Sequence, residues 1–236
     1  MKKTAATLLA VLCLLFSGVS AGADGPCVAL TFDDGPSGEI TDYLIRGLEE
    51  RGVKATFFLC CYRVTQYPQS VKDLAESGHE LAVHGATHKN FTALTGSQVR
   101  NEILCTAQAI RDLTGTRATL VRPPQGKLND LARNVMAEEG CSVILWSVDP
   151  MDWDKAHQAA VVDHVVSHAK DGDVILLHDL SRRNADAAFA VIDRLRQRGF
   201  TFCTVSELAA RVGVELLPGQ VYRAFPAEKS LLDKLG

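Results

Sequence analysis

Short apolar runs alternate along the chain with longer segments in which apolar residues recur every three or four positions. A bounded apolar run fits a buried strand, and apolar residues at i, i+3 and i+4 fit one face of a helix. The runs predict strands at residues 28–32, 55–59, 80–83, 119–121, 142–146, 174–177 and 200–202. The periodic segments predict helices at residues 40–48, 68–78, 97–115, 129–140, 155–169 and 187–195.

Residues at the predicted helix ends support these boundaries. Ser37 and Asn129 are the expected N-caps, because their side-chain oxygens can accept a hydrogen bond from a free backbone N–H. Gly52 and Gly78 are expected to end two of the helices. Strands that alternate with helices are typical of an α/β fold with a mainly parallel sheet. The pattern alone leaves an open doubly wound sheet and a closed barrel as alternatives.

Composition narrows the class of protein without naming a function. The chain has 236 residues, which fits one domain or at most two small ones. Its 47% hydrophobic and 22% charged residues exclude a disordered chain. The net charge of −3, without a long basic run, argues against a nucleic-acid-binding protein.

The two ends of the chain differ in pattern from the part between them. A positive start at Met1–Lys3, an apolar stretch to Phe16 and small residues up to Ala23 predict a signal peptide at residues 1–23. The apolar stretch is too short to span a membrane. We therefore expect an exported protein (periplasmic, cell-wall-associated or secreted) with no stable membrane anchor after cleavage. Residues 24–213 are expected to form one domain and the less periodic residues 214–236 a C-terminal extension.

The sequence does not decide whether the cysteines of the exported chain form disulfides or remain free thiols. Six follow the predicted signal peptide, at positions 27, 60, 61, 105, 141 and 203, and their spacing fits no zinc motif. Export permits disulfides. Buried free thiols, which behave as small apolar residues, remain the alternative.

Polar side chains follow five of the predicted strands. They are Asp33 and Asp34 after the first, His84 and His88 after the third, Arg122 after the fourth, Asp149 and Asp152 after the fifth, and His178 after the sixth. Each has a structural alternative as a turn or surface residue. Functional residues of parallel α/β folds gather at the carboxyl ends of strands. Adjacent carboxylates also need a cation or an arginine nearby, and histidines at i and i+4 can bind one metal ion. Together these positions favour a functional site.

A second histidine pair has the same spacing but another context. His164 and His168 lie inside a predicted helix, with no carboxylate at a strand end beside them. We interpret this pair, with His157, as part of a solvated helix face. Position after a strand, rather than spacing, is what distinguishes His84 and His88.

In this order, the strand-end segments resemble the five motifs of the polysaccharide deacetylase family, also called the NodB homology domain or carbohydrate esterase family four. The segments are Thr31-Phe32-Asp33-Asp34-Gly35, His84 to His88, Arg122-Pro123-Pro124, Asp149-Pro150-Met151-Asp152-Trp153 and Leu176-Leu177-His178. The first and fourth are specific as strings, and the others are specific by order and spacing. The resemblance covers residues 28–208, so residues 24–213 would be the deacetylase domain.

The resemblance implies a fold and an activity. The fold would be an irregular (β/α) barrel with seven or eight mainly parallel strands. The activity would be metal-dependent removal of N-acetyl groups from N-acetylglucosamine-containing glycans, such as peptidoglycan or a chitin-like polymer. The partner would thus be a polysaccharide or oligosaccharide. A His₂Asp ligand set suits Zn²⁺, with Co²⁺, Ni²⁺ or Mn²⁺ as alternatives.

The resemblance also implies a role for each motif residue. Asp34, His84 and His88 would bind the metal. Asp33 would be the general base with Arg122 orienting it, and His178 would be the general acid with Asp152 tuning its pKa. The backbone of Gln125 would contact the substrate, and Trp153 and Leu177 would form the wall of the acetyl pocket. Gly85 departs from the family pattern, which has a hydroxyl residue there, and Gln125 stands in place of an aromatic. A looser metal loop and an altered groove are therefore expected. Two alternatives follow: a glycan-binding module with weak or no catalysis, and an esterase for O-acetyl groups on xylan.

Overall fold

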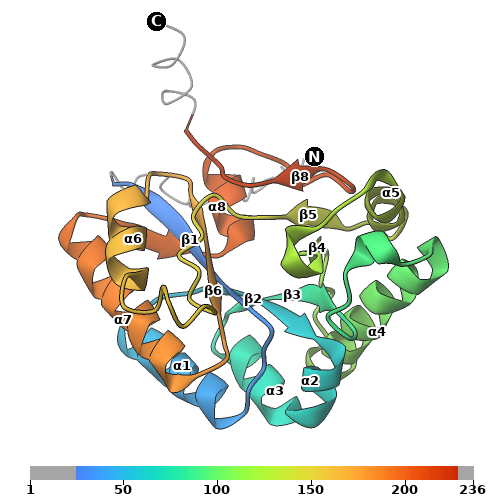
Figure 1. Cartoon of the computed structure of the whole chain (residues 1–236), viewed down its shortest axis with the longest axis horizontal. Coiled ribbons are helices and arrows are strands. Elements are labelled where there is room, and N and C mark those ends of the chain that lie inside the picture. The colour runs from blue at the N-terminus through green and yellow to red at the C-terminus, as the bar shows by residue number, and fades with distance from the viewer. Residues whose placement is uncertain (1–24, 228–236) are drawn as a thin grey trace, which may run out of the picture.

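The computed structural model describes residues 25–227, which form a curled parallel sheet with helices outside it (Figure 1). The predicted signal peptide lies outside the described residues, as does the last part of the predicted extension. The strands are β1 (Cys27–Asp33), β2 (Thr56–Cys60), β3 (Glu80–Gly85), β4 (Leu120–Val121), β5 (Ser142–Ile144), β6 (Val174–His178), β7 (Thr201–Cys203) and β8 (Val221–Tyr222). Their order is β6-β1-β2-β3-β4-β5-β8, with β7 paired to β1.

All pairings between these strands are parallel. Beyond the end of β5, Val148 forms a parallel bridge to Ile175 on β6. An antiparallel bridge between Asp173, just before β6, and Ala224, just after β8, brings the two ends of the strand path together. The sheet therefore curls into the irregular (β/α) barrel that the family resemblance implied. Because the strands run in parallel, the carboxyl ends of β1, β3, β4 and β6 lie at one rim.

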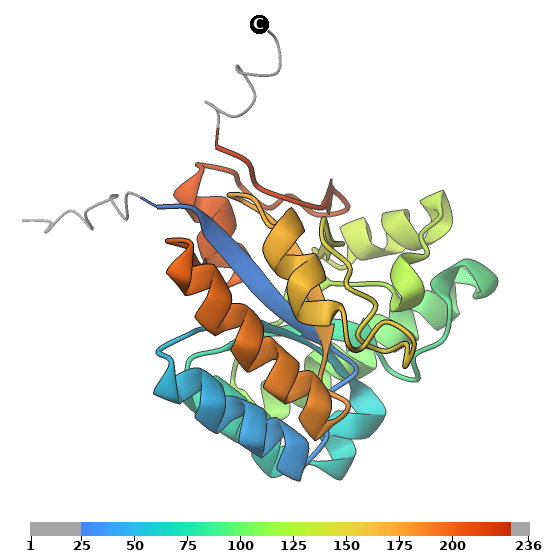
Figure 2. The same ribbon diagram turned by 60° about the vertical axis from the view of Figure 1, so that its left-hand side comes forward.

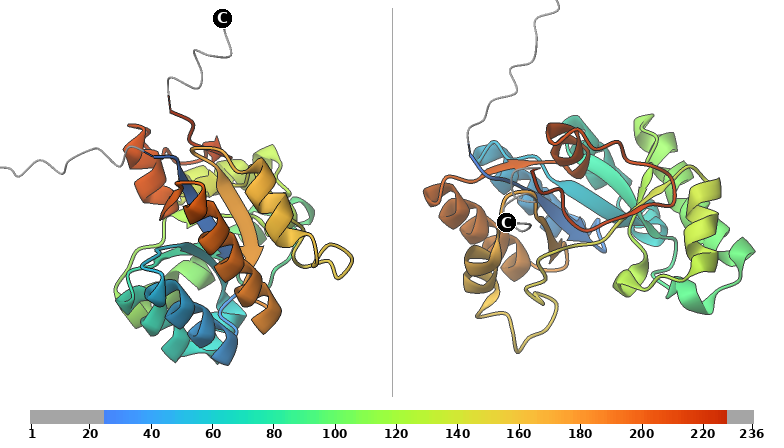
Figure 3. Two further views of the ribbon diagram at one scale, coloured as in Figure 1. Left: turned by 90° about the vertical axis from the view of Figure 1, so that its left-hand side faces the viewer. Right: turned by 90° about the horizontal axis from the view of Figure 1, so that it is seen from above.

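The helices are α1 (Glu39–Glu50), α2 (Cys61–Gln66), α3 (Pro68–Glu76), α4 (Gly96–Thr114), α5 (Asp130–Glu138), α6 (Val161–His168), α7 (Arg182–Gln197) and α8 (Val205–Arg211). Helices α1 to α7 cover the outer face of the sheet (Figure 3), and α1 and α7 pack side by side there (Figure 2). Helix α8 instead packs against residues of the inner face, such as Ala29 and Phe58. Among the described residues, no helix is long and apolar enough to cross a membrane.

Strand β1 shows how the alternation of side chains builds two layers of core. Val28, Leu30 and Phe32 pack outward in the cluster shared with the helices. Cys27 and Ala29 belong to a second cluster, on the inner face. Since successive side chains of a strand point to opposite faces, the inner side of β1 continues through Thr31 to Asp33 and ends at the rim.

Two details differ from the prediction, and one agrees with it. Helix α6 begins at Val161 rather than near Lys155, because Asp154 holds the preceding residues in turns through hydrogen bonds to Ala156 N and His157 N. Ser37 is not the cap of α1, since its hydroxyl donates to the carbonyl of Asp179. Asn129 does cap α5, accepting from Ala132 N at 2.9 Å.

The segment after residue 213 adds a strand to the sheet. Val221 and Tyr222 form β8, which pairs with Val143 and Ile144 of β5. This strand lies in the predicted C-terminal extension, whose short, weakly periodic sequence gave no strand signal. Its first half thus packs onto the barrel.

The six cysteines within residues 25–227 form one disulfide and four free thiols. Cys61, at the start of α2, is bonded to Cys105 on α4. The neighbouring Cys60 is the last residue of β2. Cys27, Cys60, Cys141 and Cys203 are free.

Candidate active site

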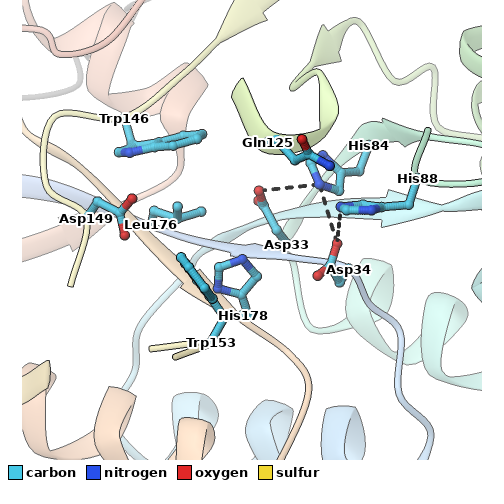
Figure 4. A pocket seen from close by; sticks show the side chains of 10 residues that line it. All are labelled: Asp33, Asp34, His84, His88, Gln125, Trp146, Asp149, Trp153, Leu176 and His178. Atoms are coloured by element: carbon cyan, nitrogen blue, oxygen red, sulfur yellow. Dashed lines mark ion pairs between the residues drawn. The ribbon is translucent and has the colours of Figure 1, made fainter. Parts of the chain in front are cut away.

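The rim at the carboxyl ends of the strands holds a cavity of about 360 Å³ (Figure 4). Its lining residues are Asp33, Asp34, His84, His88, Gln125, Trp146, Asp149, Trp153, Leu176 and His178. They come from β1, β3, β6 and the segments after β1, β3, β4 and β5. The structure therefore brings together residues from all five strand ends that the sequence singled out.

Asp34, His84 and His88 form a group that could hold a metal ion. One ligand atom from each lies within 4.8 Å of the others. Asp34 Oδ1 is 3.4 Å from His84 Nε2 and 3.1 Å from His88 Nε2. Among residues 25–227, this is the one group of three or more His, Cys, Asp or Glu side chains close enough together to share a metal ion.

The donor atoms of this group suit a cation. His84 Nδ1 is 2.8 Å from the carbonyl oxygen of Arg122, which can only accept, so Nδ1 carries the proton and the lone pair of Nε2 faces Asp34. Asp34 Oδ1 is buried and has no hydrogen-bond partner among the described residues. Burial would raise the pKa of Asp34, but positive charge on the neighbouring imidazoles would hold that pKa well below its usual range. A buried carboxylate oxygen facing an imidazole lone pair fits a divalent metal such as Zn²⁺.

Backbone strain is concentrated around the cavity. Among the described residues, four that are not glycine have a left-handed backbone: Asp34 (φ 72°), His88 (φ 59°), Gln125 (φ 61°) and Met151 (φ 54°). Each such residue costs about 1–3 kcal/mol unless its surroundings hold it. All four lie in the strand-end segments, so the fold tolerates a destabilising backbone conformation at the positions that direct these side chains.

Asp33 is buried beside the metal ligands and is fixed by Arg122. Arg122 Nη1 donates to Asp33 Oδ1 at 2.6 Å and to Thr31 Oγ1 at 2.8 Å. The guanidinium is fully buried and also donates to the carbonyls of Ile144 and Leu145. Asp33 Oδ2, which Arg122 leaves free, lies 3.6 Å from His84 Nε2. One carboxylate oxygen is thus anchored and the other faces the cavity.

His178 enters the cavity from β6 (Figure 4), and the carboxylate of Asp152 holds it from behind. Its Nδ1 donates to Asp152 Oδ1 at 2.6 Å, and its backbone N–H donates to Asp152 Oδ2 at 2.9 Å. Asn184 on α7 donates to the same Oδ2 at 2.7 Å. Burial would lower the pKa of His178, but the bond to Asp152 and the charges of nearby aspartates raise it to about 8.

The apolar side of the cavity is formed by Trp146, Leu176 and Trp153. The sequence interpretation named Leu177 instead of Leu176, and the structure corrects it. Side chains alternate along β6, so Leu176 shares the inner face with His178 while Leu177 packs outward into the core. Gln125 and Trp153 line the cavity as predicted, and the ring of Trp146 lies over the Gln125 segment, close to Gly126.

These motifs, now seen at one rim of a (β/α) barrel, agree with comparisons to known proteins. A family model described as polysaccharide deacetylase matches residues 20–144. The chain belongs to the polysaccharide deacetylase family. The peptidoglycan-N-acetylmuramic acid deacetylase PdaC of Bacillus subtilis is 39% identical over 181 residues, or 77% of this chain and 38% of that protein.

Solved structures of deacetylases share the fold. A structure described as T48 deacetylase with substrate superposes with a TM-score of 0.78 and 34% identity, covering 84% of this chain and 96% of that one. A family 4 acetyl xylan esterase from Clostridium thermocellum, in complex with a cobalt ion, gives a TM-score of 0.79 and 28% identity, covering 85% and 99%. The chain spans about two fifths of the length of the first curated relatives it matches.

Four residues around this deacetylase-family site were missed at the sequence level. Trp146 lines the cavity, Thr31 and Asn184 hold Arg122 and Asp152, and Glu102 binds the loop between the two histidine ligands. Thr31 stands two positions before Asp33, so strand alternation could have placed it on the inner face. Asn184 and Glu102 lie on helices, and their sequence context gives no comparable signal.

Proposed function

We propose that this chain is a metal-dependent hydrolase that removes N-acetyl groups from N-acetylglucosamine-containing glycans, with peptidoglycan as the first substrate to test. The observation that carries the proposal is one cavity in which the Asp34–His84–His88 group lies between two ion-paired side chains, a carboxylate and a histidine. Asp33 is held by Arg122, and His178 is held by Asp152. A base and an acid flanking one electrophilic site are what amide hydrolysis requires.

The two proton-transfer residues have environments that suit opposite tasks. Asp33 would take a proton from the attacking water through Oδ2, since Oδ1 is occupied by Arg122. The amine leaves poorly unless it gains a proton, and His178 would donate it from Nε2 because Nδ1 is bonded to Asp152. The backbone N–H of Gln125 is the proposed donor to the developing oxyanion.

Asp34, His84 and His88 would hold the metal, proposed as Zn²⁺, and leave positions open for small ligands. A bound divalent ion supplies Lewis-acid polarisation of the acetyl carbonyl and lowers the pKa of water. The cobalt ion in the acetyl xylan esterase supports a metal requirement in a related fold. That relative also keeps O-acetyl xylan open as a second candidate substrate. The names of the peptidoglycan-directed relatives support action on the cell wall, and hence an exported protein.

The test is acetate release from a panel of substrates. Peptidoglycan, N-acetylglucosamine oligomers and O-acetylated xylan are incubated with the protein and added Zn²⁺ or Co²⁺, and acetate is quantified. Release from the amide substrates supports the proposal. Release from xylan alone points to the esterase, and glycan binding without acetate from any substrate points to a binding module.

Metal removal is expected to lower acetate release by at least about a hundredfold, because Lewis-acid assistance contributes several kcal/mol. Dialysis against a chelator followed by an activity assay measures the loss, and adding back metal should reverse it. His88→Ala should bind metal much more weakly than the wild type in a competition titration. His168→Ala is the matched control from the other i, i+4 pair, on α6 and away from the cavity. Equal metal affinity in both variants would contradict the assignment.

The pH profile is expected to report His178. Its raised pKa, about 8, keeps the proposed acid protonated at neutral pH, so kcat should fall as pH rises above about 8. Asp152→Asn removes the charge that raises this pKa and leaves burial, which lowers it. The alkaline limb of kcat against pH should then move down by at least about one unit. An alkaline limb that stays in place in Asp152→Asn would remove His178 from this role.

A further inference from the structure

Glu102 is a buried carboxylate that the proposed mechanism does not use. It lies on α4, is 7% exposed, and takes both of its hydrogen bonds from one residue of the loop between the two histidine ligands. Thr87 N donates to Oε2 at 2.7 Å, and Thr87 Oγ1 donates to Oε1 at 2.6 Å. A buried charge with two such bonds fixes its partner strongly.

The position of Thr87 makes this contact relevant to the metal ligands. It immediately precedes His88, whose backbone is held at φ 59°. A non-glycine residue in that conformation needs neighbours that prevent it from relaxing. His84 sits within β3, whereas His88 lies beyond the strand and its side chain is 35% exposed. Of the two histidines, His88 therefore depends more on the loop.

The same loop is held from its other side by α2. Tyr62 N, at the start of that helix, donates to the carbonyl of Ala86 at 3.2 Å. The residue before it, Cys61, is bonded to Cys105, one turn after Glu102 on α4. Helices α2 and α4, which form hydrogen bonds with Ala86 and Thr87, are thus covalently joined by the disulfide.

Glu102 also accounts for the departure at Gly85. That glycine has φ +99°, and a Cβ there would stand 3.1 Å from Glu102 Oε2 and 3.2 Å from the Phe91 ring. A hydroxyl side chain at position 85 would compete for the space that the carboxylate fills. The sequence led us to expect a looser loop, but the structure shows a loop anchored through Thr87 instead.

We propose that Glu102 is a positioning residue for the metal ligand His88, acting through Thr87 in place of a hydroxyl at position 85. This inference rests on the metal site of the proposed function. It assigns Glu102 no contact with the substrate, so its effect should fall on metal affinity first and on turnover only through the metal.

The experiment measures metal dissociation constants by competition titration, with the visible spectrum of bound Co²⁺ as a second readout of ligand geometry. Glu102→Ala is expected to weaken metal binding by about 10–100-fold, the usual effect of removing a group that orients a ligand. Glu102→Gln can still accept from Thr87 and should lose less than Glu102→Ala. Thr87→Val, which keeps the backbone bond, should also show an intermediate loss.

Glu80 provides a matched control at the opposite end of β3. It too accepts from the backbone N–H and the hydroxyl of one residue, here Ser206 on α8, and lies away from the cavity. Glu80→Ala should leave the metal dissociation constant and the Co²⁺ spectrum unchanged, even if stability falls.

The outcomes separate this inference from the proposed function. If Glu102→Ala folds and keeps the wild-type metal affinity and spectrum, the positioning role is overturned. If that variant does not fold, the same result in Glu102→Gln and Thr87→Val overturns it. An equal loss in Glu80→Ala would also overturn it, because the effect would then be general. A wild type that binds metal but releases no acetate would refute the deacetylase activity while leaving the role of Glu102 intact. A wild type that binds no metal would overturn both.

Discussion

Asp33→Asn is expected to lower kcat for acetate release by about 10²–10⁴-fold, the range for loss of a general base. Asparagine has nearly the same shape and can still accept from Arg122, but it cannot take a proton from water at neutral pH. The metal ligands Asp34, His84 and His88 should keep their positions, because the substitution changes the charge at position 33 and hardly changes its shape. Metal affinity measured by titration should therefore remain close to that of the wild type.

Asp173→Asn is the matched control for this variant. Asp173 is a buried aspartate just before β6, at the opposite end of that strand from His178, and accepts from Ser147 Oγ at 2.8 Å. Its substitution removes a buried carboxylate charge without touching the cavity, so kcat should stay near the wild-type value. If Asp33→Asn kept more than about a tenth of wild-type kcat, the base would have to be sought elsewhere on the rim.

The strand-end residues were predictable because two local signals agree. An apolar run marks each strand, and a polar residue directly after it must lie at the rim of a parallel sheet. That reasoning placed Asp33, His84, Arg122 and His178 in one site, and the structure brings them together there. It requires only the direction of the strands, which the alternation with helices supplies.

What the sequence could not supply depends on contacts between distant segments. The choice between Leu176 and Leu177 is not of this kind, because strand alternation from His178 already places Leu176 on the inner face. The hydrogen bond that Thr87 donates to Glu102 joins a loop to a helix, and no sequence periodicity relates the two residues. The disulfide between Cys61 and Cys105 was likewise one of many pairings that six cysteines allow.

Arg122→Met is expected to lower the free energy of unfolding by about 3–5 kcal/mol, the cost of leaving a buried charge without its partner. The guanidinium is 0% exposed, and it donates to Asp33, Thr31 and the carbonyls of Ile144 and Leu145. Burial lowers the pKa of Arg122, and the charge of Asp33 opposes that effect. A typical domain has only about 5–15 kcal/mol to lose, so the variant should be close to unfolding in mild urea.

A double variant separates the charge from the rest of the contact. In Arg122→Met with Asp33→Asn, neither buried charge remains, so the combined destabilisation should be smaller than the sum of the two single effects. The carbonyls of Ile144 and Leu145 still lose their donor, so stability should not return fully. Urea titrations of all four proteins in chelator measure the cycle without a contribution from bound metal. Strictly additive effects would mean that the ion pair contributes nothing, and that Arg122 acts only by filling space beside Phe58 and tying the ends of β4 and β5 together.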